Sequence, residues 1–198
     1  MLIRTSTPTG LVISIEDVKA QTEVELDDIS RDPLLERYIR AATAFIESRT
    51  SRFLLPISLE LRLFGWCNPL RIPAAPIRSI TELVYLDEDD AEQTVDAANY
   101  TFARSTEGGS LYFIDNYTFP TLSKLPEAVT ARFMAGYDDP WASGAGGDPE
   151  THPDISDGQM VAMLAATWFT HRESLSDRRQ QQIPDGMQML IDDRRIYR

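Results

Sequence analysis

Residues Ile155–Glu173 have the sequence ISDGQMVAMLAATWFTHRE, which predicts a helix that is apolar almost all the way round. Every residue from Met160 to Phe169 except Thr167 is apolar, so no wide polar face remains for contact with water. This apolar span is far shorter than the roughly 20 residues that a helix needs to cross a bilayer. We therefore expect a buried core helix, around which the other elements of the chain pack.

Both ends of this helix carry local signals. Ser156 and Gln159 have the spacing of a capping box, which satisfies two backbone donors at a helix start. His171 and Arg172 place polar or cationic groups near the negative end of the helix dipole. The sequence therefore predicts a helix over 156–173.

The residues after this helix end in a basic, amphipathic tail. Pro184 opens a last short helix, predicted over 184–193. The tail, 194–198, combines arginines with apolar or aromatic side chains, a composition favoured at protein interfaces. A frayed terminus is the alternative interpretation of the same residues, and the sequence alone leaves both open. These residues are Arg194, Arg195, Ile196, Tyr197 and Arg198.

Two further helices are predicted near the N-terminus. Ser14 followed by Asp17 is typical of a capped start and gives a short helix over 14–21. A longer helix over 32–49 has Asp32 as its N-cap and Pro33 at its first position. Its apolar residues recur with the period of a helix: Leu35, Tyr38, Ile39, Ala42, Phe45 and Ile46.

The β region, 57–137, begins where the hydrophobic period changes to two. Ile57, Leu59, Leu61 and Leu63 alternate with polar residues, which predicts a half-buried strand. The prolines at 69, 73 and 76 are expected to exclude regular structure from the connection that follows.

Four more strands are expected in this region. Gly108 and Gly109 are expected to form a hairpin turn between the second and third of them, because glycine reaches positive φ at little cost. The four strands are predicted at Ile80–Leu86, Tyr100–Ala103, Leu111–Ile114 and Val129–Tyr137.

These elements define an α+β fold. The sequence predicts a helical core around the buried late helix, with a small, mostly antiparallel β-sheet inserted mid-chain. The length of 198 residues is that of one domain, so we expect a single domain over 1–198. A loop over 138–155 is longer than most connections without regular structure.

Composition limits the kinds of partner. The chain has 19 basic and 31 acidic residues and a formal net charge of -12, so it lacks the basic footprint of a tight nucleic-acid binder. Cys67 is the only cysteine; with His152 and His171 it supplies too few ligands for a structural zinc site. Met1–Val18 shows no secretory signal, so we expect synthesis and use in the cytosol.

Two groups of residues are candidates for chemistry. The acidic cluster Asp87–Glu92 has the oxygen ligands that divalent cations prefer, but it lacks the pattern of a calcium loop, and a solvated turn is the better interpretation. His171 and Glu173 lie two residues apart on a helix and point to different sides, so a helix-terminal cap is preferred to an acid/base pair. We expect no catalytic, cofactor-binding or metal-binding residues.

Several motifs occur together in an order that resembles one protein family. The order and spacing of these parts are similar to those of the head-tail connector (adaptor) family of long-tailed phages and phage-derived gene transfer agents. The loop at Asp138–Pro153 departs from the shorter link expected in that family. The motifs are Phe45–Thr50 at a helix end, the strand Ile57–Phe64, the proline-rich Leu70–Ile77, Phe133–Tyr137 and Trp168–Glu173.

The resemblance implies a structural protein that is not an enzyme. It implies a ring, expected to be a dodecamer, docked between the portal of a capsid and the tail-side stopper or completion protein. DNA would only pass through its channel, and no membrane is involved. The protein would be cytoplasmic during assembly and then part of the particle. By the same resemblance, Ile183–Arg198 is expected to contact the portal, chiefly through the five residues of the tail.

A second hypothesis comes from a different class. The chain would be a small acidic enzyme or regulatory binding module, with His171, Glu173 or the Asp87–Glu92 turn in its site. This alternative requires a concave pocket that brings these separated groups together.

Overall fold

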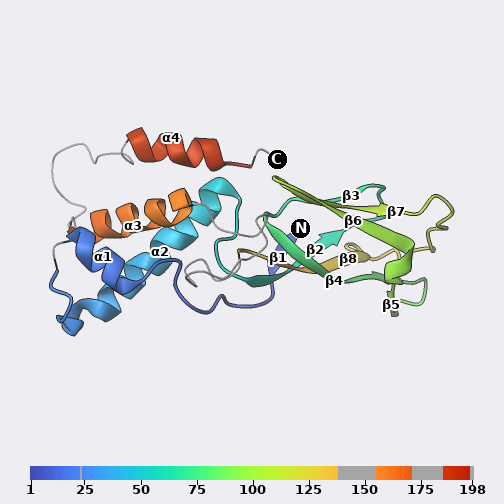
Figure 1. Ribbon diagram of the computed structural model, residues 1–198. Coiled ribbons are helices and arrows are strands. Elements are labelled where there is room, and N and C mark those ends of the chain that lie inside the picture. The colour runs from blue at the N-terminus through green and yellow to red at the C-terminus, as the bar shows by residue number, and fades with distance from the viewer. Residues whose placement is uncertain (23, 138–154, 171–184, 197–198) are drawn as a thin grey trace. The chain divides into compact units, whose positions relative to one another are not determined.

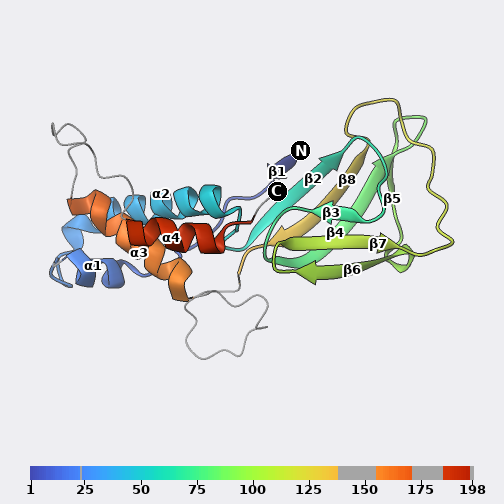
Figure 2. The same cartoon turned by 90° about the horizontal axis from the view of Figure 1, so that it is seen from above.

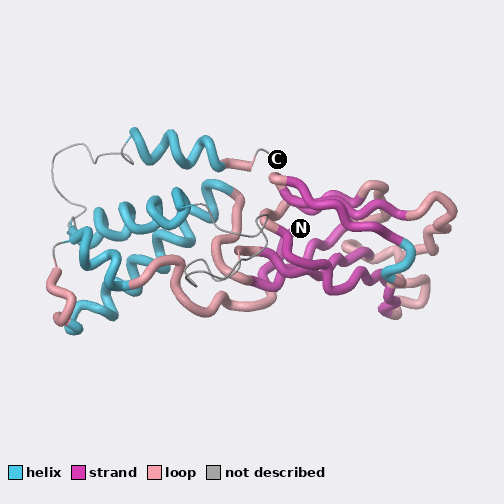
Figure 3. The backbone as a smooth tube through the Cα atoms, viewed as in Figure 1, coloured by secondary structure: helices cyan, strands magenta, loops and turns pink. Residues whose placement is uncertain are grey.

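The chain divides into two compact units. A computed structural model describes residues 1–22, 24–137, 155–170 and 185–196. The helical unit comprises Thr9–Leu55 and Asp138–Tyr197, and the β unit comprises Met1–Pro8 and Pro56–Tyr137. Figure 3 shows that the α-helices belong to one unit and the strands to the other. The α+β class is confirmed, although contacts define two units where the sequence predicts a single domain.

The helical unit is built around the predicted core helix, now α3. Met160, Val161 and Ala165 of α3 have no exposed surface, and α3 packs against α1, α2 and α4. No helix among the described residues has the length and apolar character needed to span a membrane. The α-helices among the described residues are α1 (Ile15–Thr22), α2 (Asp32–Thr50), α3 (Ile155–Thr170) and α4 (Asp185–Arg194).

The predicted helix starts are partly confirmed. At α1 the backbone N–H of Asp17 donates to Ser14 Oγ at 3.1 Å, so this cap is confirmed. At α2 the N-cap is Arg31, not Asp32, because a 3₁₀ turn at Ile29–Arg31 leads directly into the helix. Asp32 instead forms an ion pair with the buried Lys19, whose Nζ lies 2.7 Å from its Oδ1.

The core helix also begins earlier than predicted. It starts at Ile155, so Ser156 lies in its first turn rather than at the N-cap. It is described as far as Thr170, so the predicted cap of His171, Arg172 and Glu173 lies outside the described residues.

The β unit contains two antiparallel sheets, which Figures 1 and 2 show as two layers. The five-stranded sheet has the order β1-β2-β8-β4-β5, and the three-stranded sheet has the order β3-β7-β6. The first sheet consists of β1 (Leu2–Arg4), β2 (Ile57–Leu63), β8 (Val129–Ala135), β4 (Ile77–Leu86) and β5 (Glu92–Thr94). The second consists of β3 (Leu70–Ile72), β7 (Gly108–Phe113) and β6 (Tyr100–Ser105).

Buried and more exposed side chains alternate along the strands, so each sheet has one buried face and one outer face. Leu59, Leu61 and Phe133 of the larger sheet, and Leu70 and Leu111 of the smaller one, are at most 5% exposed. Successive side chains of a strand point to opposite faces, so the residues between them lie on the outer faces of the two sheets. The predicted half-buried strand at Ile57 is therefore confirmed.

Two predictions about the β region are wrong in detail. Pro69 and Pro73 do not exclude regular structure, because they flank strand β3 without interrupting its ladder with β7. The expected hairpin exists, but Ser105 pairs with Gly108, so the turn is formed by residues 106 and 107. Gly108 (φ +138°) is needed for another reason: a Cβ there would clash with the carbonyl oxygen of Ile72, 2.3 Å away.

Candidate functional site

The C-terminal segment, predicted as the partner-binding site, is anchored within the helical unit. Arg194 ends α4 and donates from Nε and Nη2 to the two carboxylate oxygens of Asp157, at 3.1 and 2.7 Å. Asp157 lies in the first turn of α3 and is only 1% exposed. Paired charge-assisted hydrogen bonds of this kind fix orientation as well as distance. The end of α4 is therefore held against the start of α3.

The next residues continue this attachment. The backbone N–H of Ile196 donates to the carbonyl oxygen of Thr50 at 2.9 Å, and its side chain is 4% exposed. Arg52 Nε donates to the carbonyl oxygen of Arg194 at 2.8 Å. Arg195 is exposed.

The five tail residues are therefore not gathered into one exposed patch. Arg194 and Ile196 hold the segment in place, and Arg195 faces solvent. Tyr197 and Arg198 lie outside the described residues.

A second candidate is the outer face of the five-stranded sheet, where charged side chains line up across strands. Glu60 of β2 and Glu82 of β4 both pair in register with Arg132 of the central strand β8. Arg132 contacts Glu82 at 2.8 Å, Glu92 of β5 at 2.9 Å and Glu60 at 3.2 Å. One guanidinium group thus joins carboxylates from three other strands.

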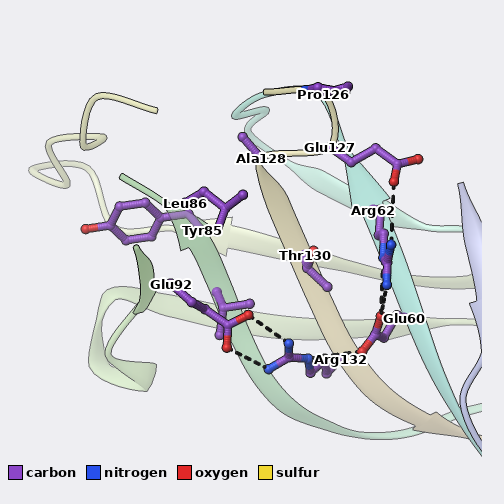
Figure 4. Close-up of a pocket in the computed structure, with 11 residues that line it drawn as sticks. Glu60, Arg62, Tyr85, Leu86, Glu92, Pro126, Glu127, Ala128, Thr130 and Arg132 are labelled. Carbon is purple, nitrogen blue, oxygen red and sulfur yellow. Dashed lines mark hydrogen bonds and ion pairs between the residues drawn. The ribbon is translucent and has the colours of Figure 1, made fainter. Parts of the chain in front are cut away.

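A polar pocket of about 220 Å³ lies beside this array, and Figure 4 shows its lining. Arg62 Nη2 contacts Glu60 at 3.0 Å, and Arg62 Nη1 lies 3.7 Å from Glu127. In Figure 4, Glu127 and Arg62 stand on one side of the pocket and Glu92 on the other, and Arg132 lies between Glu92 and Glu60. We call Glu60, Glu92 and Glu127, with these two arginines, the carboxylate pocket.

Ion pairs shift the pKa values of two groups of this pocket, Glu60 and Arg132. Burial alone would raise the pKa of Glu60, but hydrogen bonds from Arg62 and Arg132 outweigh it and lower that pKa. Hydrogen bonds to Glu92 and Glu82 raise the pKa of Arg132. Glu60 and Arg132 therefore remain charged near neutral pH and are suited to ionic contact rather than to proton transfer.

The acidic cluster at Asp87–Glu92 forms a hydrogen-bonded turn. Asp87 accepts hydrogen bonds from Gln93 and from the backbone N–H groups of Ala91 and Asp89, and these lower its pKa. Ser123 donates its hydroxyl hydrogen to Asp90. Among the described residues, no group of three or more potential ligands is arranged to hold a metal ion.

The remaining sequence candidates are not brought together. Cys67 is exposed, although the protein still covers part of its thiol and so raises the pKa of the thiol. His152, His171 and Glu173 lie outside the described residues.

Sequence comparison assigns the family. The family model described as Phage gp6-like head-tail connector protein matches residues 12–117, more than half of the chain. The chain belongs to this family of head-tail connectors. No curated protein matches this connector significantly. The family is a structural class of virion proteins and not an enzyme class, so the chain is a structural head-tail connector.

Solved structures share the fold over the whole connector. A chain of the virion of a native gene transfer agent particle has a TM-score of 0.76 at 23% identity, with 100% of this chain and 96% of that chain covered. The neck of an empty particle, computed with C6 symmetry, gives a TM-score of 0.74 at 23% identity, with the same coverage. The neck of a native particle, computed with C12 symmetry, gives 0.67 at 24% identity, again with 100% and 96% covered.

The charged sheet face was not found by sequence reasoning. Its signal was present, because Glu60, Glu82 and Arg132 occupy polar positions within predicted strands. The sequence does not show which strands are neighbours. Strands β2 and β4 pair with β8, which comes much later in the chain, so these three side chains could not be placed together.

Proposed function

We propose that this connector assembles as a ring of twelve copies between the capsid portal and the tail-side completion protein of a phage-like particle. Family membership carries this proposal, and the C12 symmetry of a neck that contains the same fold supports the copy number. The ring is assembled in the cytoplasm and becomes part of the particle at the head-tail junction. It catalyses no reaction.

The charge of the chain supports a channel for DNA. A net charge of -12 gives a ring with strongly negative surfaces. A negative lining repels phosphate groups, so a passing duplex does not adhere to it. DNA is therefore a transient occupant and not a bound ligand.

The C-terminal segment is the proposed portal contact. Arg194 and Ile196 position the segment through Asp157 and Thr50, and Arg195, exposed beyond the end of α4, presents a cation to the portal. Tyr197 and Arg198 complete the proposed contact. The anchoring residues and the contacting residues therefore have separate roles.

Native mass spectrometry of the purified connector, alone and with its portal protein, tests the assembly. A ring of copies, formed alone or only on the portal, is the expected result. A connector that stays monomeric and does not bind the portal would refute the proposal.

The portal contact is tested by removing residues 197–198 in combination with Arg195→Glu. This variant keeps Arg194 and Ile196 and should retain the far-UV circular dichroism of the parent protein. It should no longer co-sediment with portal-bearing capsids. Arg37→Glu, the same charge reversal at an exposed position of α2, serves as the control and should still co-sediment. Co-sedimentation of the tail variant at the parent level would show that the contact lies elsewhere.

A further inference from the structure

A closed ring of identical subunits needs two different, complementary patches on each subunit. Contacts of this head-to-tail kind are heterologous, because one patch of each copy meets the other patch of its neighbour. The β unit carries two surfaces of opposite character on the outer faces of its two sheets. One is the carboxylate pocket, and the other is a face of the three-stranded sheet centred on Arg71.

The carboxylate pocket has an excess of negative charge. Its three glutamates and two arginines give the pocket itself a net charge of -1. Glu82, which also contacts Arg132, brings the charge of the whole ionic array to -2. Glu127 is its least satisfied member, because its nearest guanidinium nitrogen in the array is 3.7 Å away, beyond hydrogen-bond distance. The other carboxylates are already fixed by Arg132 and Arg62. An incoming cation therefore meets a pre-ordered site with one carboxylate still available.

The outer face of the three-stranded sheet presents Arg71. Arg71 is the middle residue of β3, and its neighbours Leu70 and Ile72 are buried, so Arg71 lies on the outer face. Among the described residues Arg71 has no hydrogen bond or ion pair from its side chain. It pairs with Ser110 of β7, which pairs in turn with Ala103 of β6. These small side chains leave the guanidinium group standing above its surroundings.

An exposed aromatic residue lies on the same face. Tyr112 is 49% exposed and is two residues from Ser110 on β7, so the two side chains share a face. Tyrosine and arginine are enriched at protein interfaces. Arg71, Ser110, Ala103 and Tyr112 are called the Arg71 face.

We propose that the Arg71 face of one copy docks on the five-stranded sheet of the next copy, with the Arg71 guanidinium group in the carboxylate pocket beside Glu127. This inference rests on the ring proposed above. Arginine presents a planar set of donors that matches a carboxylate, and the negative pocket rejects phosphate-bearing partners. Both patches belong to one β unit, so every copy offers a donor to one neighbour and a pocket to the other. Repetition of the same contact then builds the ring.

Charge reversal tests the contact. The variants Arg71→Glu and Glu127→Arg each place like charges at every junction, and each should lose the ring under conditions in which the parent protein forms it, alone or on the portal. Arg37→Glu is again the matched control and should keep the ring. Native mass spectrometry gives the copy number, and circular dichroism checks that each variant is folded.

Mixing the two variants separates a lost contact from a damaged subunit. In an alternating ring, Arg71 of the Glu127→Arg variant meets Glu127 of the Arg71→Glu variant. At the other junction, the glutamate introduced at position 71 meets the arginine introduced at position 127, so both junctions again pair opposite charges. An equimolar mixture should therefore recover rings with equal numbers of the two variants, and the double variant should form rings by itself.

The outcomes distinguish this inference from the ring itself. Rings formed by either single variant at the parent level would overturn the contact and leave the ring intact. Loss of rings by the singles without recovery in the mixture or in the double variant would also overturn the contact. Failure of the parent protein to form any ring would overturn both proposals.

Discussion

The ion pair between Arg194 and Asp157 is the anchor of the C-terminal segment, and its loss should be costly. Replacing Arg194 with methionine removes the guanidinium group and leaves the Asp157 carboxylate, which is 1% exposed, without this partner. The hydrocarbon part of the side chain is largely kept. The substitution therefore measures the contribution of the ion pair to stability, separately from the packing of the side chain.

The size of the effect follows from burial. Breaking a buried pair by removing one partner costs about 3–5 kcal/mol, and the lower end applies here because the Arg194 side chain is 19% exposed. We therefore expect a loss of about 3 kcal/mol, which lowers the melting temperature of a chain of this size by roughly 6–12 °C. A double variant, Asp157→Leu with Arg194→Met, places two apolar groups together and should recover most of the loss, to within about 1 kcal/mol of the parent.

Thermal unfolding followed by circular dichroism at the helical band measures all four proteins of this double-mutant cycle. The coupling between the two positions should be at least about 2 kcal/mol, well above the additivity error of about 0.5 kcal/mol. Additive losses in the double variant, with coupling inside that error, would show that the two side chains do not stabilise one another. The segment would then have to be held by the backbone contacts of Ile196 with Thr50 and of Arg194 with Arg52.

Three further predictions concern the rest of the chain. Gly108→Ala should destabilise the β unit by about 2 kcal/mol or more in urea titrations, because its Cβ meets a backbone oxygen. Gly10→Ala, also at positive φ but in open space, should cost only about 1 kcal/mol. Equal losses in the two variants would refute the clash with the carbonyl oxygen as the cause. Lys19→Met leaves Asp32 without its ion pair and should cost about 1–3 kcal/mol; an unchanged urea midpoint would contradict this. The pKa of Glu60 is lower in the folded protein than its ordinary value of 4.5. The ionised Glu60 therefore stabilises the fold above that value, and this contribution is lost as the pH falls through the folded pKa. Glu60→Gln should make the loss of stability in acid less steep, and an unchanged steepness would contradict the lowered pKa of Glu60.

Local signals were enough to predict the helices. Ser14 and Asp17 specify the start of α1 through contacts three residues apart, and the apolar period of Leu35, Ile39 and Ile46 identifies the buried face of α2. Such patterns depend on neighbours along the chain, so they are visible in the sequence. The start of α2 at residue 32 is confirmed, but Asp32 is the first residue of the helix rather than its N-cap, and it forms an ion pair with Lys19 of α1.

Elements that depend on a distant partner were missed. Strands β1, β3 and β5 have three residues each, too few for a period to be seen, and each exists because a longer strand pairs with it. The carboxylate pocket was missed for the same reason: Glu60, Glu92 and Arg132 meet only once the order of the strands is known. Within the tail, the sequence indicated a basic amphipathic segment, but the partner that holds Arg194 lies 37 residues earlier.

The position of β8 in its sheet restricts when the protein can fold during synthesis. The central strand of the five-stranded sheet is the last of its strands to be made, so β2 and β4 lack the strand that joins them until residues 129–135 have left the ribosome. The core of the helical unit can form only later, because α1 and α2 pack against α3, which begins at residue 155. Neither core can close on a nascent chain that stops before these points. The growing polypeptide therefore carries exposed apolar strands and helices for most of its translation, a state in which chaperones prevent aggregation.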